Sequence, residues 1–91
     1  MKITSRYLED NLVGADSVGK KRDGSGNFVI RRGYFYTGGM DADKFAESIS
    51  KQMNEMNINH TVVGQGDHWA PFKGGASIAK QSHFWVEVSV G

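Results

Sequence analysis

Residues 38–57 read GGMDADKFAESISKQMNEMN, and this stretch decides the fold because it has the pattern of one well-capped amphipathic helix. Asp41 is placed to accept a backbone N–H of the first turn, and Asp43 puts a second negative charge near the positive end of the helix dipole. Met40 can pack on Phe45 across the helix start. Apolar residues then recur three, four and seven positions apart, which indicates one buried stripe. The stripe consists of Ala42, Phe45, Ala46, Ile49, Met53 and Met56.

Segments with strand character lie on both sides of this helix. A polar run leads through a glycine-rich turn at 23–26 into residues 27–37, NFVIRRGYFYT, and this arrangement predicts a β-hairpin. Beyond the helix, residues 58–65 (INHTVVGQ) predict another strand. Residues 82–90 (SHFWVEVSV) alternate apolar and polar side chains, as a strand with one buried face does. Trp85 should therefore lie on the less buried face of the last strand.

Two irregular features are expected, one within a strand and one between two strands. Gly33 is expected to mark a β-bulge, which would place Tyr34 and Tyr36 on the same face as Arg31. Residues 66–81 (GDHWAPFKGGASIAKQ) contain no convincing strand or helix. Loops of this length are uncommon in compact domains and are often functional.

Together these elements predict a small single-sheet α+β domain. The main helix, about 41–57, packs on one face of a mostly antiparallel sheet, and a short first helix over residues 3–13 gives the order (α)-β-β-α-β-β. With 91 residues the chain makes a single domain, 1–91, with a small core. The last strand could lie at a sheet edge and pair with a second copy, which would give a homodimer.

The composition excludes several classes of protein. The chain has no cysteine, so it contains neither a disulfide nor a thiolate zinc site. No apolar run approaches the roughly 20 residues of a membrane span, and the N-terminus lacks the apolar core of a signal peptide. We therefore expect a cytoplasmic protein without a membrane partner.

One hypothesis for function is nucleic-acid binding by an aromatic and basic sheet face. Residues 1–39 carry seven Lys or Arg against four Asp or Glu, and aromatic residues lie among these cations. Bases stack on aromatic rings for about 1–3 kcal/mol each, while cations contact phosphates. Aromatic residues also complete cores, however, and lysines also protect edge strands from pairing. The residues of this hypothesis are Arg31, Arg32, Tyr34, Tyr36 and Trp85, with Lys20, Lys21 and Arg22 on phosphates. The sequence leaves open whether Arg31 or Arg32 faces the open side of the sheet.

A second hypothesis is a small module that binds another protein, either a host protein or a component of a complex. Trp69, Phe72 and Lys73 lie in the 66–81 segment, and together with Trp85 they could anchor a partner. The aromatic residues could equally fill the end of the core. A net charge of only +1 favours this hypothesis over nucleic-acid binding. Such a module would be an adaptor or inhibitor of the kind that phages and other mobile elements direct at host proteins.

The sequence contains no recognisable catalytic or cofactor motif. Three histidines and two carboxylates could in principle bind a metal or move a proton, but their spacing matches no zinc motif. A serine nucleophile would lack the G-x-S-x-G elbow. We therefore expect no metal and no cofactor, and the sequence favours a protein that is not an enzyme. The residues considered are His60, His68, His83, Asp67 and Glu87, and the serines Ser77 and Ser82.

Overall fold

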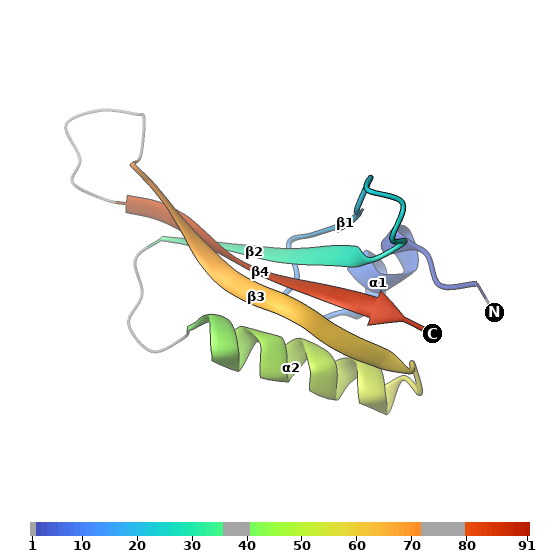
Figure 1. Cartoon of the computed structure of the whole chain (residues 1–91). Helices are drawn as coiled ribbons and strands as arrows, with labels where there is room; N and C mark the ends of the chain where they lie inside the picture. Colours follow the sequence, from blue (N-terminus) through green and yellow to red (C-terminus); the bar gives the residue numbers. More distant parts are fainter. Residues whose placement is uncertain (1, 36–40, 72–79) are drawn as a thin grey trace.

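The described part of the chain forms one antiparallel sheet of four strands with two helices packed on it, which confirms the predicted order (α)-β-β-α-β-β. The structure is a computed structural model that describes residues 2–35, 41–71 and 80–91. Figure 1 shows the elements, which are α1 (Ser5–Asn11), β1 (Ser17–Lys20), β2 (Phe28–Phe35), α2 (Ala42–Glu55), β3 (His60–Pro71) and β4 (Lys80–Val90).

The strand order in the sheet is β1-β2-β4-β3, so the last strand lies inside the sheet. β2 pairs with β4 from Phe28↔Val88 to Phe35↔Gln81, and β3 pairs with its other side along its whole length. The expectation that the last strand lies at an edge was therefore wrong. A homodimer cannot form through β4, because both of its edges already pair within the chain.

The main helix is confirmed, and its start is capped as predicted. The Asp41 side chain accepts a hydrogen bond from the Lys44 backbone N–H at 2.8 Å. After the helix the backbone turns at Asn57, which has the left-handed φ of 59°. The predicted contact of Met40 lies outside the described residues. Within the predicted stripe, the buried members are Phe45, Ala46, Ile49 and Met53.

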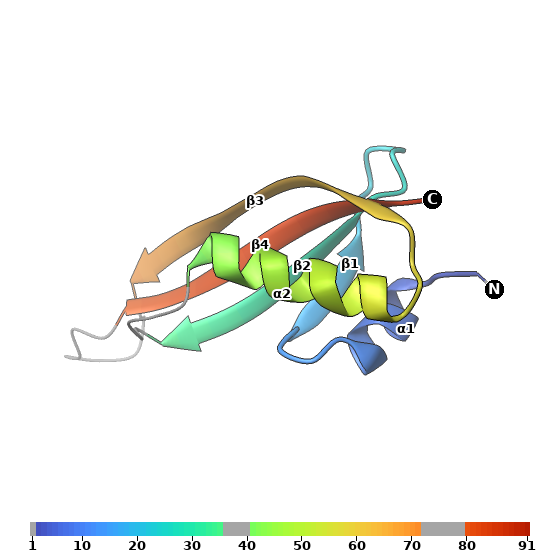
Figure 2. The same ribbon diagram turned by 90° about the horizontal axis from the view of Figure 1, so that it is seen from below.

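The core lies between the sheet and the two helices, which cover the same face (Figure 2). β4 supplies the centre of this core, because Phe84, Val86 and Val88 are buried while Trp85 and Glu87 between them are only partly buried. This confirms the predicted alternation. The rings of Phe84 and Phe45 lie 6.1 Å apart, within the range of favourable aromatic pairs.

The irregular features differ from the predictions. The β2–β4 ladder passes through Gly33 without a register shift, so the bulge predicted there is absent. Instead, β3 has a register shift between Val62 and Gly64. The prediction of a loop over residues 66–81 was also wrong in part, because 66–71 belong to β3 and 80–81 to β4, which pair as a long hairpin. Pairing with the strongly alternating β4 outweighs the weak strand propensity of the glycines and proline in β3. Residues 72–79 lie outside the described chain.

Candidate functional site

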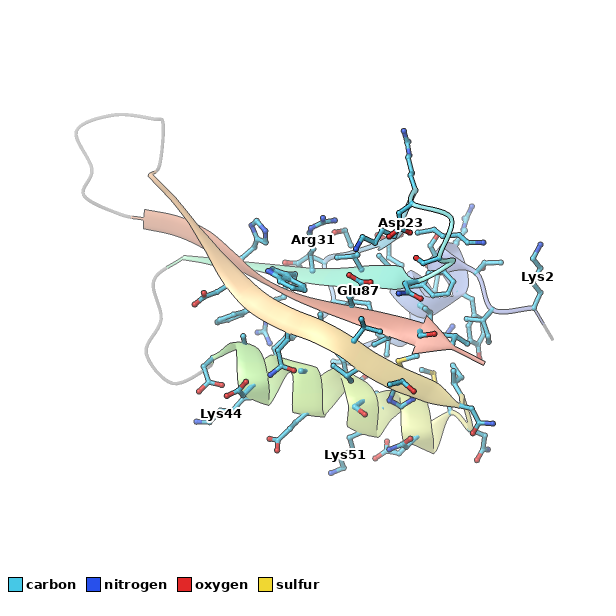
Figure 3. All side chains as sticks on the ribbon, viewed as in Figure 1. Lys2, Asp23, Arg31, Lys44, Lys51 and Glu87 are labelled. Atoms are coloured by element: carbon cyan, nitrogen blue, oxygen red, sulfur yellow. The ribbon has the colours of Figure 1, made fainter. Side chains whose placement is uncertain are left out.

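The face of the sheet opposite the helices is not covered by any helix or strand of the described chain, and we call it the uncovered face. The side chains on it alternate along each strand with those of the core. Figure 3 shows Arg31 of β2 and Glu87 of β4 on the side of the sheet away from α2. The uncovered face therefore presents the side chains of Val29, Arg31, His83, Trp85 and Glu87.

The centre of the uncovered face is a shallow depression of about 460 Å³, lined by Val29, Arg31, His83 and Trp85. Arg31 and Trp85 are register partners on neighbouring strands. Directly opposed residues have Cβ atoms about 4.5–5.5 Å apart, so the guanidinium and the indole belong to one contact surface. Arg31 is exposed and Trp85 half-buried. The lining of the depression thus combines a cation, an aromatic ring and an aliphatic side chain.

Trp85 lies across two glycines of β3 rather than standing away from the sheet. A Cβ atom at Gly66, its register partner, would lie 2.9 Å from the indole Nε1. A Cβ atom at Gly64 would lie 3.5 Å from the indole Cζ3, an ordinary contact. A glycine in a strand often marks such a close approach. The spacing Gly-x-Gly in β3 was therefore a sequence signal for this packing, and the sequence analysis did not use it.

A polar network lies beside the depression, toward the β1–β2 turn. Glu87, whose side chain is only 12% exposed, accepts hydrogen bonds from Asn27 Nδ2 at 2.8 Å and from Lys21 Nζ at 3.0 Å. These contacts stabilise the carboxylate and hold the pKa of Glu87 below its ordinary value. Glu87 in turn raises the pKa of Lys21, and Asp23, 3.5 Å from Lys21 Nζ, adds to this effect.

The network is expected to make the free energy of unfolding depend on pH. The pKa of Glu87 is lower in the folded chain than in the unfolded chain. Its contribution is therefore present above the ordinary glutamate value of about 4.3 and is lost as the pH falls through the folded-state pKa. The pKa of Lys21 is raised, so its contribution is present below the ordinary lysine value of about 10.4 and is lost as the pH rises through the folded-state pKa.

Glu87→Gln tests the acid side of this dependence, with urea denaturation measured in steps from pH 7 to pH 3. We expect the variant to be less stable than the wild type at pH 7 and the difference to narrow below about pH 4, where the wild type begins to lose the same charge. Asn27→Ala, which removes one donor and keeps the carboxylate, should show the same trend more weakly. A difference that stays constant with pH would contradict the assigned role of Glu87.

The structure separates the residues of the nucleic-acid hypothesis. Arg31 lies on the uncovered face, whereas Arg32 pairs in register with buried Phe84 and reaches toward Gly14 near α1, on the helix side. Lys21 contacts Glu87 and Asp23. Lys20 and Arg22 are exposed at the hairpin. Tyr34 lies in β2 opposite Ser82, but its side chain and the whole of Tyr36 are outside the described part of the structure.

The residues of the protein-binding hypothesis are described only in part. Trp85 lies at the centre of the uncovered face. Trp69 lies in β3, in register with Ser82, while its side chain is outside the described part. Phe72 and Lys73 lie wholly outside it.

The structure also brings together a serine and a histidine that the sequence analysis did not pair. Ser50 Oγ of α2 lies 2.6 Å from His60 Nε2 at the start of β3, and His60 Nδ1 lies 2.9 Å from the Ile58 carbonyl oxygen. Because a carbonyl only accepts, Nδ1 carries a hydrogen, and in the neutral imidazole Nε2 then accepts from the serine hydroxyl. This contact ties β3 to α2. No local sequence signal could reveal it, since it depends on how β3 returns beside the helix.

The three histidines all lie in the sheet, and His68 of β3 is in register with His83 of β4, although the His68 side chain is outside the described part of the structure. His60 pairs in register with Val90 at one end of the sheet, and His83 lies further along β4 on the uncovered face. Within residues 2–35, 41–71 and 80–91, no group of three His, Asp or Glu side chains could hold a metal ion. Over the same residues, no helix is long and apolar enough to cross a membrane. Comparison of the chain with protein-family models, curated proteins and solved structures finds no significant match.

Proposed function

We propose that this chain is a protein-binding module, an adaptor or inhibitor, whose contact surface is the uncovered face. The observation that supports this proposal is the pairing of Trp85 with Arg31 beside a depression of about 460 Å³. Trp and Arg are enriched among the few residues that carry most of the binding energy of an interface. A partner side chain entering the depression would contact the indole, the guanidinium and Val29 together.

The charges around the depression favour a protein over a nucleic acid as the partner. Affinity for nucleic acid comes largely from cations that contact phosphates. On the uncovered face Lys21 is paired with Glu87, and the Glu87 carboxylate itself would repel a phosphate backbone. Arg32 lies on the other side of the sheet. Arg31 therefore remains as the main cation at the depression, which suits one carboxylate of a protein partner better than a row of phosphates.

The test begins with affinity capture from the cells that produce the protein, followed by isothermal titration calorimetry with the purified partner. Trp85→Ala should raise the Kd by about 30-fold or more, as expected for a hot-spot tryptophan. Arg31→Ala should also weaken binding. Lys51→Ala is the matched control, because Lys51 is exposed on α2, away from the uncovered face (Figure 3), and its loss should leave the Kd unchanged.

Circular dichroism must show that each variant is folded before its affinity is interpreted. A partner that binds the Trp85→Ala and Arg31→Ala variants as tightly as the wild type would contradict the proposal. The same proteins are titrated with labelled single- and double-stranded oligonucleotides at low and physiological salt. Binding that weakens steeply with salt and disappears in Trp85→Ala would instead assign the uncovered face to a nucleic acid.

A further inference from the structure

The outer edge of β3 is a second surface of interest, distinct from the uncovered face. β3 is 12 residues long and pairs with β4 alone, so in the described chain its other edge has no neighbour. Every second residue of such an edge directs its N–H and C=O groups away from the sheet. An edge of this kind is a template for one more strand.

The two edges of the sheet differ in their protection against such pairing. β1, at the opposite edge, is only four residues long, and lysines and an arginine lie at its end, which are the usual guards of an edge strand. β3 contains no Lys or Arg over its whole length. It also has an exposed Val63, with 55% of its surface accessible. The β3 edge therefore lacks the lysines and arginine of the β1 edge, and its charged residue is the exposed Asp67.

A groove of about 460 Å³ lies beside this edge, between α2 and β3. Val62 and Gln65 of β3 face it although they are three residues apart, because the register shift between Val62 and Gly64 changes the side-chain phase. Gln65 also donates a hydrogen bond to Asp43 across the groove. The lining residues are Asp43, Ala46, Glu47 and Ser50 from α2 with Val62 and Gln65 from β3.

Two kinds of strand could pair with the β3 edge, namely β3 of a second copy and an extended peptide of a partner protein. The charge of the groove favours the peptide. Asp43 and Glu47 are negative, and no Lys or Arg is among the described residues that line the groove. A two-fold pairing of β3 with a second copy would bring two such grooves, with four carboxylates, to the same side of the joint sheet. An extended peptide with lysine or arginine at every second position would instead place its cations beside these carboxylates.

We propose that the β3 edge binds an extended basic segment of a partner protein as a fifth strand, with the basic side chains of the segment in the groove between β3 and α2. Strand addition of this kind takes its affinity from main-chain hydrogen bonds and its specificity from alternate side chains. The site does not include Trp85 or Arg31, so this proposal can be tested independently of the proposed function of the uncovered face.

The test uses a fluorescein-labelled octapeptide of alternating threonine and lysine, with binding measured by anisotropy at low salt. We expect saturable binding, and none by the peptide in which glutamate replaces lysine. Glu47→Lys should weaken binding by about tenfold. Glu55→Lys makes the same charge change on an exposed residue of α2 outside the groove and should have a much smaller effect. Arg31→Ala, in β2 and not adjacent to β3, should bind the peptide as the wild type does.

Two further measurements separate strand addition from general charge attraction. The same peptide N-methylated at every residue keeps its charge but has no N–H to donate, and it should bind at least about tenfold more weakly. Amide hydrogen exchange should slow along β3 when the unmodified peptide binds. Equal losses in Glu47→Lys and Glu55→Lys, or equal binding of the methylated peptide, would overturn the proposal. Sedimentation showing a dimer that does not bind the peptide would overturn it as well.

Discussion

Replacing Phe84 with alanine is expected to lower the free energy of unfolding by about 3–5 kcal/mol. Phe84 is only 2% exposed and lies on the inner strand β4, where its ring packs against Phe45 of α2 at 6.1 Å. The substitution removes apolar contacts on both sides of the core and leaves a cavity that the sheet and helix cannot easily close. A domain of this size has a total stability of only about 5–15 kcal/mol, so the variant should be partly unfolded near physiological temperature.

Urea denaturation followed by far-UV circular dichroism measures this loss. Phe84→Leu, which keeps most of the apolar volume, should lose less stability and remain folded, so the comparison holds even where Phe84→Ala does not fold. Val13→Ala is the exposed control, because Val13 is 80% exposed and its replacement should change stability by at most about 0.5 kcal/mol. A loss below about 1 kcal/mol in Phe84→Ala would contradict its place in the core.

Gly66→Ala is expected to have the second largest effect, because it drives a methyl group into Trp85. The new Cβ atom would lie 2.9–3.0 Å from three atoms of the indole, so the ring must move off β3. Overpacking of this kind costs about 1–3 kcal/mol. Gly66 does not have a positive φ, so alanine can adopt the same backbone conformation. The loss of stability therefore comes from the displacement of the Trp85 ring. In a Trp69→Phe background, the emission of Trp85 should shift as its ring leaves the glycines.

Gly64→Ala is the matched control for this prediction. Its Cβ atom would meet the same ring at 3.5 and 3.6 Å, which is ordinary contact, and alanine restricts the unfolded chain more than glycine does. We therefore expect a stability change near zero or a small gain. In a Trp85→Ala background the cost of Gly66→Ala should disappear, since the atoms that it meets are gone. A cost that persists in that background would locate the strain elsewhere in β3.

The predicted elements were correct where the signal lies within a few neighbouring residues. The cap at Asp41, the helical stripe through Phe45 and Ile49, and the alternation around Trp85 all follow from period and local hydrogen bonding. The candidate site was predicted less completely. The position of Trp85 on the open side of its strand was correct, whereas its contact with Gly66 depends on which strand lies beside it.

Strand neighbours explain the other errors as well. The sequence left open which of Arg31 and Arg32 faces the open side of the sheet. The register of β2 with β4 decides it, because consecutive residues of a strand point to opposite faces and Arg31 lies opposite Trp85 on the uncovered face. β4 is the last strand in sequence order, but this gave no information about its position in the sheet. In the structure β4 lies between β2 and β3. Ser50 and His60 meet only because β3 returns along α2.

The sequence by itself determined the kind and order of the secondary-structure elements and, for α2 and β4, which side faces the core, because hydrophobic periodicity is a local property of the chain. The tertiary structure decided which strands are neighbours, and therefore which edge is free and which residue lies opposite Trp85. Those contacts join residues far apart in the sequence. Their free energy depends on packing across the whole sheet, which no single stretch of residues encodes.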